Sequence, residues 1–200
     1  MYEKVIKRCI DVVASGVGMA ALALPMVAVA VITKLDSPGP IFFKQKRVGK
    51  DKTHFEIIKL RSMSVNTPSE VPSHLLENPG DHLTRWQKLI RTYAIDEIPQ
   101  LYNIFVGDMS FVGPRPALWN QFDLIAERDK HGANRVKPGL TGLAQMTSLN
   151  LDIAEKARLD GEYAANVSFK TDLRCIVGTA RYFARLAVGT ANRTKKKKKI

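Results

Sequence analysis

The chain has 200 residues, enough for one domain with a hydrophobic core and an appended element. Its 31 lysine and arginine residues outnumber 19 acidic residues, and the net charge of +12 indicates an anionic partner: nucleic acid, lipid headgroups or phosphorylated small molecules. Two cysteines without C-x-x-C spacing argue against a disulfide framework and fit a reducing compartment, and the four histidines form no metal-binding pattern.

An uncharged stretch of 21 residues, 12–32, is long enough for a membrane helix. No small-residue cleavage site follows it, so it is not typical of a secretory signal. Pro25 lies inside the stretch and predicts a bend, because it removes a backbone hydrogen bond. Lysine and arginine flank both ends, and the positive-inside rule places both flanks on the cytoplasmic side. A bent helix that enters and leaves by the same face satisfies both flanks, and a tilted full span stays open on these residues alone.

Two strand-like runs, 41–48 and 53–60, surround a polar turn at 49–52 and predict a β-hairpin. In the second run the two-residue period places Lys59 and Arg61 at the end of an apolar face. Both a solvated strand end and a contact with phosphate fit this position.

Residues 66–81 show no periodicity and predict a loop. Hydrophobic residues then recur at helical spacing over 83–93, with basic residues between them. This pattern predicts an amphipathic helix that packs in the core or lies in the lipid headgroup layer.

Asp96 and Glu97 follow directly, just before Pro99. Because proline is tolerated in the first turn of a helix, Asp96 is the expected N-cap of a helix that begins here. The helix dipole would keep both carboxylates ionised and attract phosphate, with a divalent cation or arginines to offset the two negative charges. A simple capping role for Asp96 is the alternative.

Arg115 lies between Pro114 and Pro116, which restrict its backbone on both sides. A guanidinium held in this way suits bidentate binding to phosphate or carboxylate. The remaining elements expected in chain order are a stiff turn at 137–142, a short strand at 143–146, a helix at 152–165 and a further amphipathic helix over 173–183.

Five motifs occur in a fixed order along the chain, and together they resemble the bacterial sugar transferase family, the monotopic polyprenol-phosphate phosphoglycosyl transferases. The resemblance extends from the N-terminal hydrophobic segment to about residue 179. The motifs are F-K-Q-K-R-V-G (43–49), K-L-R-S-M (59–63), I-D-E-I-P-Q (95–100), G-D-M-S-F-V-G-P-R-P (107–116) and K-P-G-L-T-G-L-A-Q (137–145).

The resemblance implies an enzyme that transfers a sugar 1-phosphate from a UDP-sugar to undecaprenyl phosphate and releases UMP. It implies that Asp96 is the nucleophile, forming a covalent aspartyl-phosphosugar intermediate, and that Glu97 helps to hold Mg²⁺. The implied partners are the UDP-sugar, undecaprenyl phosphate and inner-membrane lipids, with no nucleic acid, and a homo-oligomer stays open. The residues that map to the family's substrate-binding positions are Lys59, Arg91, Arg115 and Asp172.

The same resemblance implies a re-entrant helix bent at a proline, here Pro25, at the cytoplasmic face of the bacterial inner membrane. The expected fold is therefore α+β and mainly helical, with a small β-hairpin and interfacial amphipathic helices. The expected units are a membrane-inserted re-entrant helix at 1–36, a catalytic domain at 37–190 and a disordered basic tail at 191–200, which has too little apolar surface to fold.

The chain departs from the family pattern at two places. Leu24 precedes the proline where a serine is common, and Met146 to Asn150 stand where many members carry Gly-Arg-Asn, so the sequence does not indicate the sugar. Two alternatives to covalent catalysis stay open. One is a non-enzymatic, membrane-tethered protein that binds anionic lipid or nucleic acid. The other is an enzyme in which Asp96 acts as a base for direct attack by the lipid phosphate.

Overall fold

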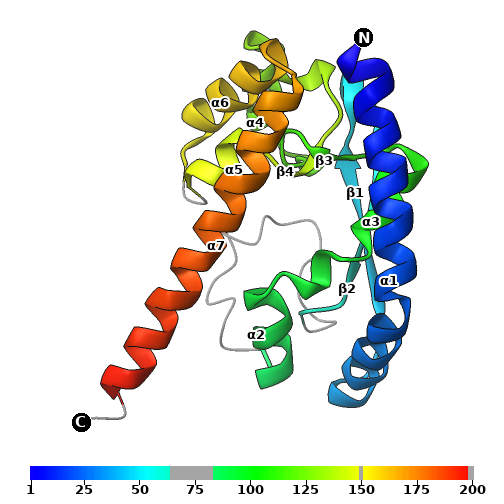
Figure 1. The fold of residues 1–200 in the computed structure, drawn as a ribbon, viewed down its shortest axis with the longest axis vertical. Helices are drawn as coiled ribbons and strands as arrows, with labels where there is room; N and C mark the ends of the chain where they lie inside the picture. Colours follow the sequence, from blue (N-terminus) through cyan, green and yellow to red (C-terminus); the bar gives the residue numbers. More distant parts are fainter. Residues whose placement is uncertain (64–82, 149–150, 198–200) are drawn as a thin grey trace.

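The computed structural model of the chain describes residues 1–63, 83–148 and 151–197, so the loop expected at 66–81 lies outside the described residues. The described chain is mostly helical, with two small two-stranded sheets. In Figure 1 the long helices α1 and α7 run lengthwise, while α4, α5 and α6 gather near the end where the chain begins. The helices are α1 (Lys7–Asp36), α2 (Arg85–Thr92), α3 (Gln100–Val106), α4 (Phe122–Lys130), α5 (Leu143–Thr147), α6 (Ile153–Ala165) and α7 (Phe169–Lys197), with short helical turns at Tyr2–Ile6, Lys50–Lys52, Ile95–Glu97 and Ala133–Arg135.

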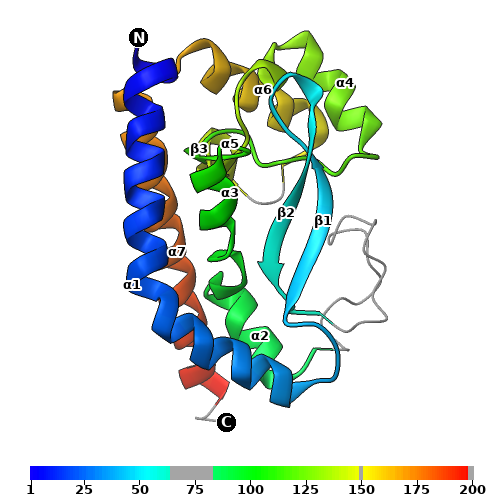
Figure 2. The ribbon, with the colours of Figure 1, turned by 90° about the vertical axis from the view of Figure 1, so that its right-hand side faces the viewer.

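Helix α1, together with the turn before it, is long and apolar enough to cross a membrane. Pro25 lies inside it, and Figure 2 shows that α1 bends in its second half. The bend agrees with the loss of a backbone hydrogen bond at proline. Whether the chain returns to the same membrane face stays a prediction. The outward side chains of α1 are large and apolar, as expected for contact with lipid: Val13 (65% exposed), Val17 (65%), Leu24 (81%) and Val27 (60%).

The predicted hairpin is confirmed. Strands β1 (Phe42–Val48) and β2 (His54–Leu60) pair antiparallel. Arg61, just beyond β2, is buried and donates hydrogen bonds to the carbonyl oxygens of Ser37 (2.6 Å) and Pro38 (2.8 Å). Its guanidinium therefore binds the backbone that follows α1, and of the two cations at the end of β2 only Lys59 remains for an anionic ligand.

The amphipathic helix expected over 83–93 is confirmed as α2. Its N-terminus forms a capping box, in which the side chain of Thr84 accepts from the backbone N–H of Gln87 and the side chain of Gln87 accepts from the backbone N–H of Thr84. Helix α3 is attached to β2 through the amide of Asn103, which accepts from Ile58 N at 3.0 Å and donates to Glu56 O at 2.8 Å. These contacts bring the acidic pair between α2 and α3 to the end of the hairpin.

The prediction that Asp96 is an N-cap is wrong. Ala94 adopts a left-handed conformation (φ 53°), and Asp96 lies within the short 3-10 turn Ile95–Glu97. Helix α3 begins only after Pro99, which occupies the N-cap position without a side-chain cap. The left-handed residue redirects the chain before α3 can start, so the Asp96 side chain is free to bond elsewhere.

A parallel pair of short strands, β3 (Ser110–Val112) and β4 (Gly139–Thr141), joins two of the motifs. The backbones approach so closely that a Cβ at Gly139 would lie 2.1 Å from the backbone nitrogen of Gly113, which explains why glycine is needed there. The prediction of a strand at 143–146 is wrong. Pairing with β3 ends at Thr141, and after the extended residue Gly142 the chain turns into helix α5.

The two C-terminal helices follow the prediction in part. Asp152 caps α6, its carboxylate accepting from Glu155 N at 2.7 Å. Helix α7 continues to Lys197, through most of the segment 191–200 for which the sequence predicts disorder, in keeping with the high helix propensity of alanine, arginine and lysine. The domain boundaries themselves stay predictions. A buried apolar group joins β3, α5, α6 and α7: Val112, Val136, Leu143, Ala144, Leu159, Tyr163 and Cys175.

Candidate active site

Three of the predicted site residues are in direct contact, because Lys59 and Arg115 both bind the carboxylate of Glu97. Its Oε1 accepts from Lys59 Nζ at 2.9 Å and from Arg115 Nη2 at 2.6 Å. Lys59 comes from β2 and Arg115 from the segment after β3, so residues far apart in sequence converge on one carboxylate. The Arg115 side chain is 41% exposed, whereas Lys59 and Glu97 are 16% and 17% exposed. The cluster therefore presents its arginine to solvent.

Asp96 lies next to this cluster and is buried, with 8% of its surface exposed. Its Oδ2 accepts a hydrogen bond from Ser62 Oγ at 2.9 Å. Between described residues, neither Asp96 Oδ1 nor Glu97 Oε2 accepts a hydrogen bond. One oxygen of each carboxylate is thus held in place and the other is left for a ligand.

The two carboxylates have opposite electrostatic character. Burial raises the pKa of Asp96 above its usual value, although Lys59 and the hydrogen bond from Ser62 oppose the change. Burial acts in the same direction on Glu97, but the ion pairs with Arg115 and Lys59 outweigh it and hold its pKa well below the usual range. Glu97 is therefore a fixed anion, whereas Asp96 is a carboxylate whose charge is poorly stabilised, as suits a nucleophile.

Arg91 completes the set around the acidic pair. It lies in the last turn of α2, is half-buried, and its charge favours the ionised form of Asp96. Within the described part of the chain its side chain makes no hydrogen bond or ion pair. Its guanidinium is consequently available for an anion.

Asp172, the remaining predicted substrate-binding residue, does not join this cluster in the structure. It is buried at the start of α7, where it accepts from Lys7 Nζ (2.6 Å), Tyr2 OH (2.7 Å) and Tyr163 OH (2.8 Å). It thereby links α7 to α6 and to the start of α1. None of its contacts involves the acidic pair, and its place in substrate binding stays a prediction.

Two features of the site were not predicted from the sequence. Ser62 stands inside the K-L-R-S-M motif, and a hydroxyl within that motif was the available signal. The second feature is a buried ion pair in which Arg128 donates to Asp160 Oδ2 from Nε (2.9 Å) and Nη2 (2.6 Å). Arg128 also donates to the carbonyl oxygen of Arg115 at 2.9 Å, and so fixes the backbone that carries this arginine. No local pattern indicates this pair, because its members are 32 residues apart.

Further positive charge lies around Arg115. Burial, followed by the charge of Arg115, lowers the pKa of Arg47 to about 10. Burial, followed by the charge of Arg128, lowers the pKa of Lys156 to about 8, and Arg115 adds to the effect. These groups repel one another in the absence of a ligand, which is the electrostatics expected of a site for a multiply charged anion.

The residues present also bear on the expected Mg²⁺. Among the described residues no group of three or more histidines, cysteines or acidic residues could hold a metal ion. Asp96 and Glu97 supply two carboxylates with one unengaged oxygen each. Mg²⁺ commonly binds one or two carboxylates together with substrate phosphates and water. The pair therefore fits a magnesium ion that arrives with a phosphorylated substrate, rather than a closed protein site.

An acidic pair set among arginines and lysines, on a body attached to a long apolar helix, is the arrangement expected of a membrane-associated protein that acts on a phosphorylated substrate. The family model described as bacterial sugar transferase matches residues 2–185. The chain therefore belongs to the bacterial sugar transferase family, and this relationship supports the expected enzyme class, a phosphoglycosyl transferase.

Three relatives illustrate the match. A UDP-N-acetylgalactosamine-undecaprenyl-phosphate N-acetylgalactosaminephosphotransferase of Aeromonas hydrophila is 38% identical, over 88% of this chain and 43% of the relative. A UDP-glucose:undecaprenyl-phosphate glucose-1-phosphate transferase of Caulobacter vibrioides is 35% identical, over 86% of this chain and 67% of the relative. The exopolysaccharide production protein PSS of Rhizobium leguminosarum is 37% identical, over 88% of this chain and 94% of the relative. This chain thus spans less than half of the first relative and nearly all of the third.

Proposed function

We propose that this chain transfers a sugar 1-phosphate from a UDP-sugar to undecaprenyl phosphate, with Asp96 as the nucleophile. The observation that carries the proposal is the pairing of a buried, weakly stabilised carboxylate with a second carboxylate held by Lys59 and Arg115. The names of the relatives, which specify UDP-sugars and undecaprenyl phosphate, supply the substrate classes.

The reaction has two displacements at one phosphorus atom. Asp96 Oδ1 attacks the phosphorus that carries the sugar, an aspartyl–phosphorus bond forms, and the bond to the UMP oxygen breaks with its electron pair leaving on UMP. An oxygen of undecaprenyl phosphate then attacks the same phosphorus and releases the Asp96 carboxylate. The products are UMP and undecaprenyl diphosphate bearing the sugar.

Each residue of the site has a distinct part in these steps. The hydrogen bond from Ser62 orients Asp96 and leaves Oδ1 toward the substrate. Arg91 and Arg115 bind the diphosphate and offset its negative charge, because both present guanidinium groups beside the acidic pair. Mg²⁺, when bound with the substrate, would be held by the free oxygen of Glu97 and would neutralise further charge on the diphosphate, while Asp96 Oδ1 stays free to attack phosphorus.

The membrane segment would keep this chemistry at the level of the lipid phosphate. We place the body of the chain at the cytoplasmic face of the bacterial inner membrane, with α1 as a re-entrant helix bent at Pro25. Labelling of cysteines introduced at Lys4 and Lys34 in sealed vesicles tests this topology. Both sites should react from the same side, and reaction from opposite sides would establish a full span.

An assay of UMP release against a panel of UDP-sugars, with undecaprenyl phosphate present, tests the activity directly. Release with at least one sugar is expected. Salt-dependent binding of anionic lipid or nucleic acid without any UMP release would instead favour the non-enzymatic alternative. Incubation with UDP-sugar alone should leave a phosphosugar on the protein, whereas direct attack by the lipid phosphate predicts none.

Replacing Glu97 with glutamine should raise the Mg²⁺ concentration needed for half-maximal activity by about tenfold or more, since a metal-binding carboxylate becomes a neutral amide. The measurement is a Mg²⁺ titration of UMP release at saturating UDP-sugar. Glu56→Gln is the control, because Glu56 is exposed and its 3.5 Å ion pair with Lys44 lies on the outside of the hairpin. An identical titration for Glu97→Gln and the parent would remove Glu97 as a metal ligand.

Replacing Ser62 with alanine should move the acidic limb of the pH–activity profile to higher pH. The nucleophile must be ionised, and the raised pKa of Asp96 means that activity is lost as pH falls through that value. The hydrogen bond from Ser62 favours the ionised form, so its removal raises the pKa of Asp96 further. The measurement is kcat/KM for the UDP-sugar across the acidic range, and an unmoved limb would show that Asp96 does not control it.

A further inference from the structure

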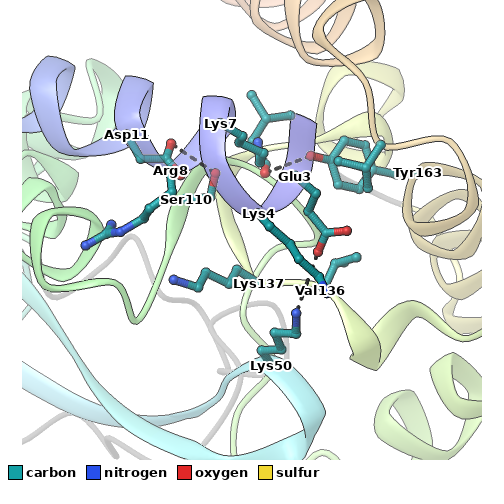
Figure 3. Close-up of a pocket in the computed structure, with 12 residues that line it drawn as sticks. Glu3, Lys4, Lys7, Arg8, Asp11, Lys50, Ser110, Val136, Lys137 and Tyr163 are labelled. Carbon is teal, nitrogen blue, oxygen red and sulfur yellow. Dashed lines mark hydrogen bonds and ion pairs between the residues drawn. The ribbon is translucent and has the colours of Figure 1, made fainter. Parts of the chain in front are cut away.

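A second cationic site lies away from the acidic pair, at the start of α1. A cavity of about 220 Å³ opens between the first turns of α1, the hairpin turn and the residues before β4, as Figure 3 shows. Five cationic and two acidic side chains line it. They are Lys4, Lys7, Arg8, Lys50 and Lys137, with Glu3 and Asp11.

The acidic side chains do not neutralise this cavity. Asp11 is buried and accepts hydrogen bonds from Ser110 Oγ and Phe111 N, both at 3.1 Å. Glu3 is paired only loosely with Lys50, at 3.6 Å. The carboxylates are thus engaged by the protein itself, and an excess of positive charge remains.

Three of the five cations already have a partner in the protein, although the contact of Lys50 with Glu3 is long. Lys7 pairs with Asp172, and Arg8 donates to the carbonyl oxygens of Ile104 and Phe105 at 2.7 Å each. Between described residues, the side chains of Lys4 and Lys137 make no hydrogen bond or ion pair. In Figure 3 the ends of the Lys4 and Lys50 side chains approach one another near Glu3, while the Lys137 amine points toward Arg8 on the other side of the cavity.

Lys137 is held in an unfavourable position. A Cβ at Gly107 would lie 3.2 Å from its Nζ and 3.2 Å from Arg8 Nη2, so the two cations meet over the same glycine. Gly107 itself has φ +102°, a conformation that other residues rarely adopt. Burial, followed by the charge of Arg8, lowers the pKa of the Lys137 amine. Lys137 is thus half-buried, faces another cation and has no ion pair with a carboxylate, so a bound anion would stabilise its charge.

The cavity is distinct from the candidate active site. It shares no lining residue with the cluster around Asp96 and Glu97, and the charges that act on Lys137 belong to Arg8, Asp11, Lys50 and Asp108. We propose that this cavity binds a phosphate or pyrophosphate group, held by Lys137, Lys4 and Lys50. Val112, Val136 and Val167 form an apolar wall that would accept an uncharged part of the same molecule. Such a ligand would join the start of α1 to the hairpin turn.

Inorganic pyrophosphate is the probe, titrated calorimetrically into the full chain in lipid-free detergent. The Lys59→Gln background weakens binding at the acidic pair and isolates the second site. In that background Lys137→Gln should weaken pyrophosphate binding about tenfold, the usual effect of losing one charged hydrogen bond. Lys52→Gln is the matched control. Lys52 lies on the hairpin turn that also carries Lys50, but it is exposed and pairs with Asp129 at 3.0 Å outside the cavity.

The proposal would be overturned if Lys137→Gln bound pyrophosphate as tightly as the Lys59→Gln parent. It would also be overturned if Lys52→Gln lost as much pyrophosphate affinity as Lys137→Gln. Lys137→Gln alone should keep its thermal midpoint without pyrophosphate, since it breaks no contact and removes a repulsion. It should also keep UMP release, so failure of this proposal and failure of the catalytic assignment are distinguishable.

Repeating the titration in nanodiscs of phosphatidylglycerol identifies the source of the phosphate. A Lys137-dependent drop in pyrophosphate affinity there assigns the site to a lipid headgroup, and unchanged affinity assigns it to a soluble ligand.

Discussion

Replacing Asp96 with asparagine should abolish turnover of the UDP-sugar, with a loss of at least about three orders of magnitude in kcat. The amide has nearly the same shape as the carboxylate, but it cannot attack phosphorus and form the acyl phosphate. Folding should be preserved. Burial already disfavours the charged form of Asp96, and the hydrogen bond from Ser62 can be accepted by the amide oxygen. UMP release and the amount of phosphosugar trapped on the protein are the two measurements.

Asp51→Asn provides the matched control. Asp51 is exposed on the hairpin turn in a left-handed conformation (φ 53°) that asparagine also tolerates, so this variant should release UMP at the parent rate. Near-normal UMP release from Asp96→Asn would remove Asp96 from the chemistry. A large loss of turnover in Asp96→Asn, together with no phosphosugar trapped on the parent protein, would instead assign Asp96 as a base for direct attack by the lipid phosphate.

The parts of the fold that local patterns determine were predictable from the sequence. The two-residue period gave the hairpin with Lys59 at its end, and the helical period gave α2 and α6. The ordered motifs indicated the family, which the match over residues 2–185 confirms. They also singled out Lys59, Arg115 and Glu97, which the fold brings into direct contact.

The errors arose where tertiary contacts override local preference. Asp96 has the residue type and spacing of an N-cap, yet the left-handed turn at Ala94 delays the helix and Ser62 takes the carboxylate instead. At 143–146 the apolar residues fit a strand as well as a helix, and only the pairing of β3 with the preceding residues decides between them. A short apolar run carries too little periodicity to make that distinction.

Contacts between distant segments had no sequence signal at all. Asp172 meets Lys7 across 165 positions, in a buried pair that attaches α7 to α1. The pair of Arg128 and Asp160 also lacks a sequence signal, although it supports the backbone of Arg115. The sequence could therefore indicate the candidate site residues more readily than the residues that hold them in place.

Replacing Asp160 with alanine should destabilise the folded chain by about 3–5 kcal/mol, the usual effect of leaving one member of a buried ion pair without its partner. Asp160 and Arg128 are 1% and 4% exposed, so water cannot solvate the orphaned guanidinium. Because Arg128 also binds the carbonyl oxygen of Arg115, its displacement should raise KM for the UDP-sugar in the fraction that remains folded. Denaturant unfolding in detergent and UMP-release kinetics measure the two effects.

Glu155→Gln is the control on the same helix. Glu155 pairs with Arg158 on the exposed surface at 2.8 Å, and solvent screening leaves such a pair with little effect on stability. A second variant, Arg128→Met with Asp160→Leu, should recover much of the stability because no charge stays buried, while KM remains raised, since methionine cannot donate to the Arg115 carbonyl. Recovery of both stability and KM in this double variant would show that the ion pair contributes to the fold alone and does not position Arg115.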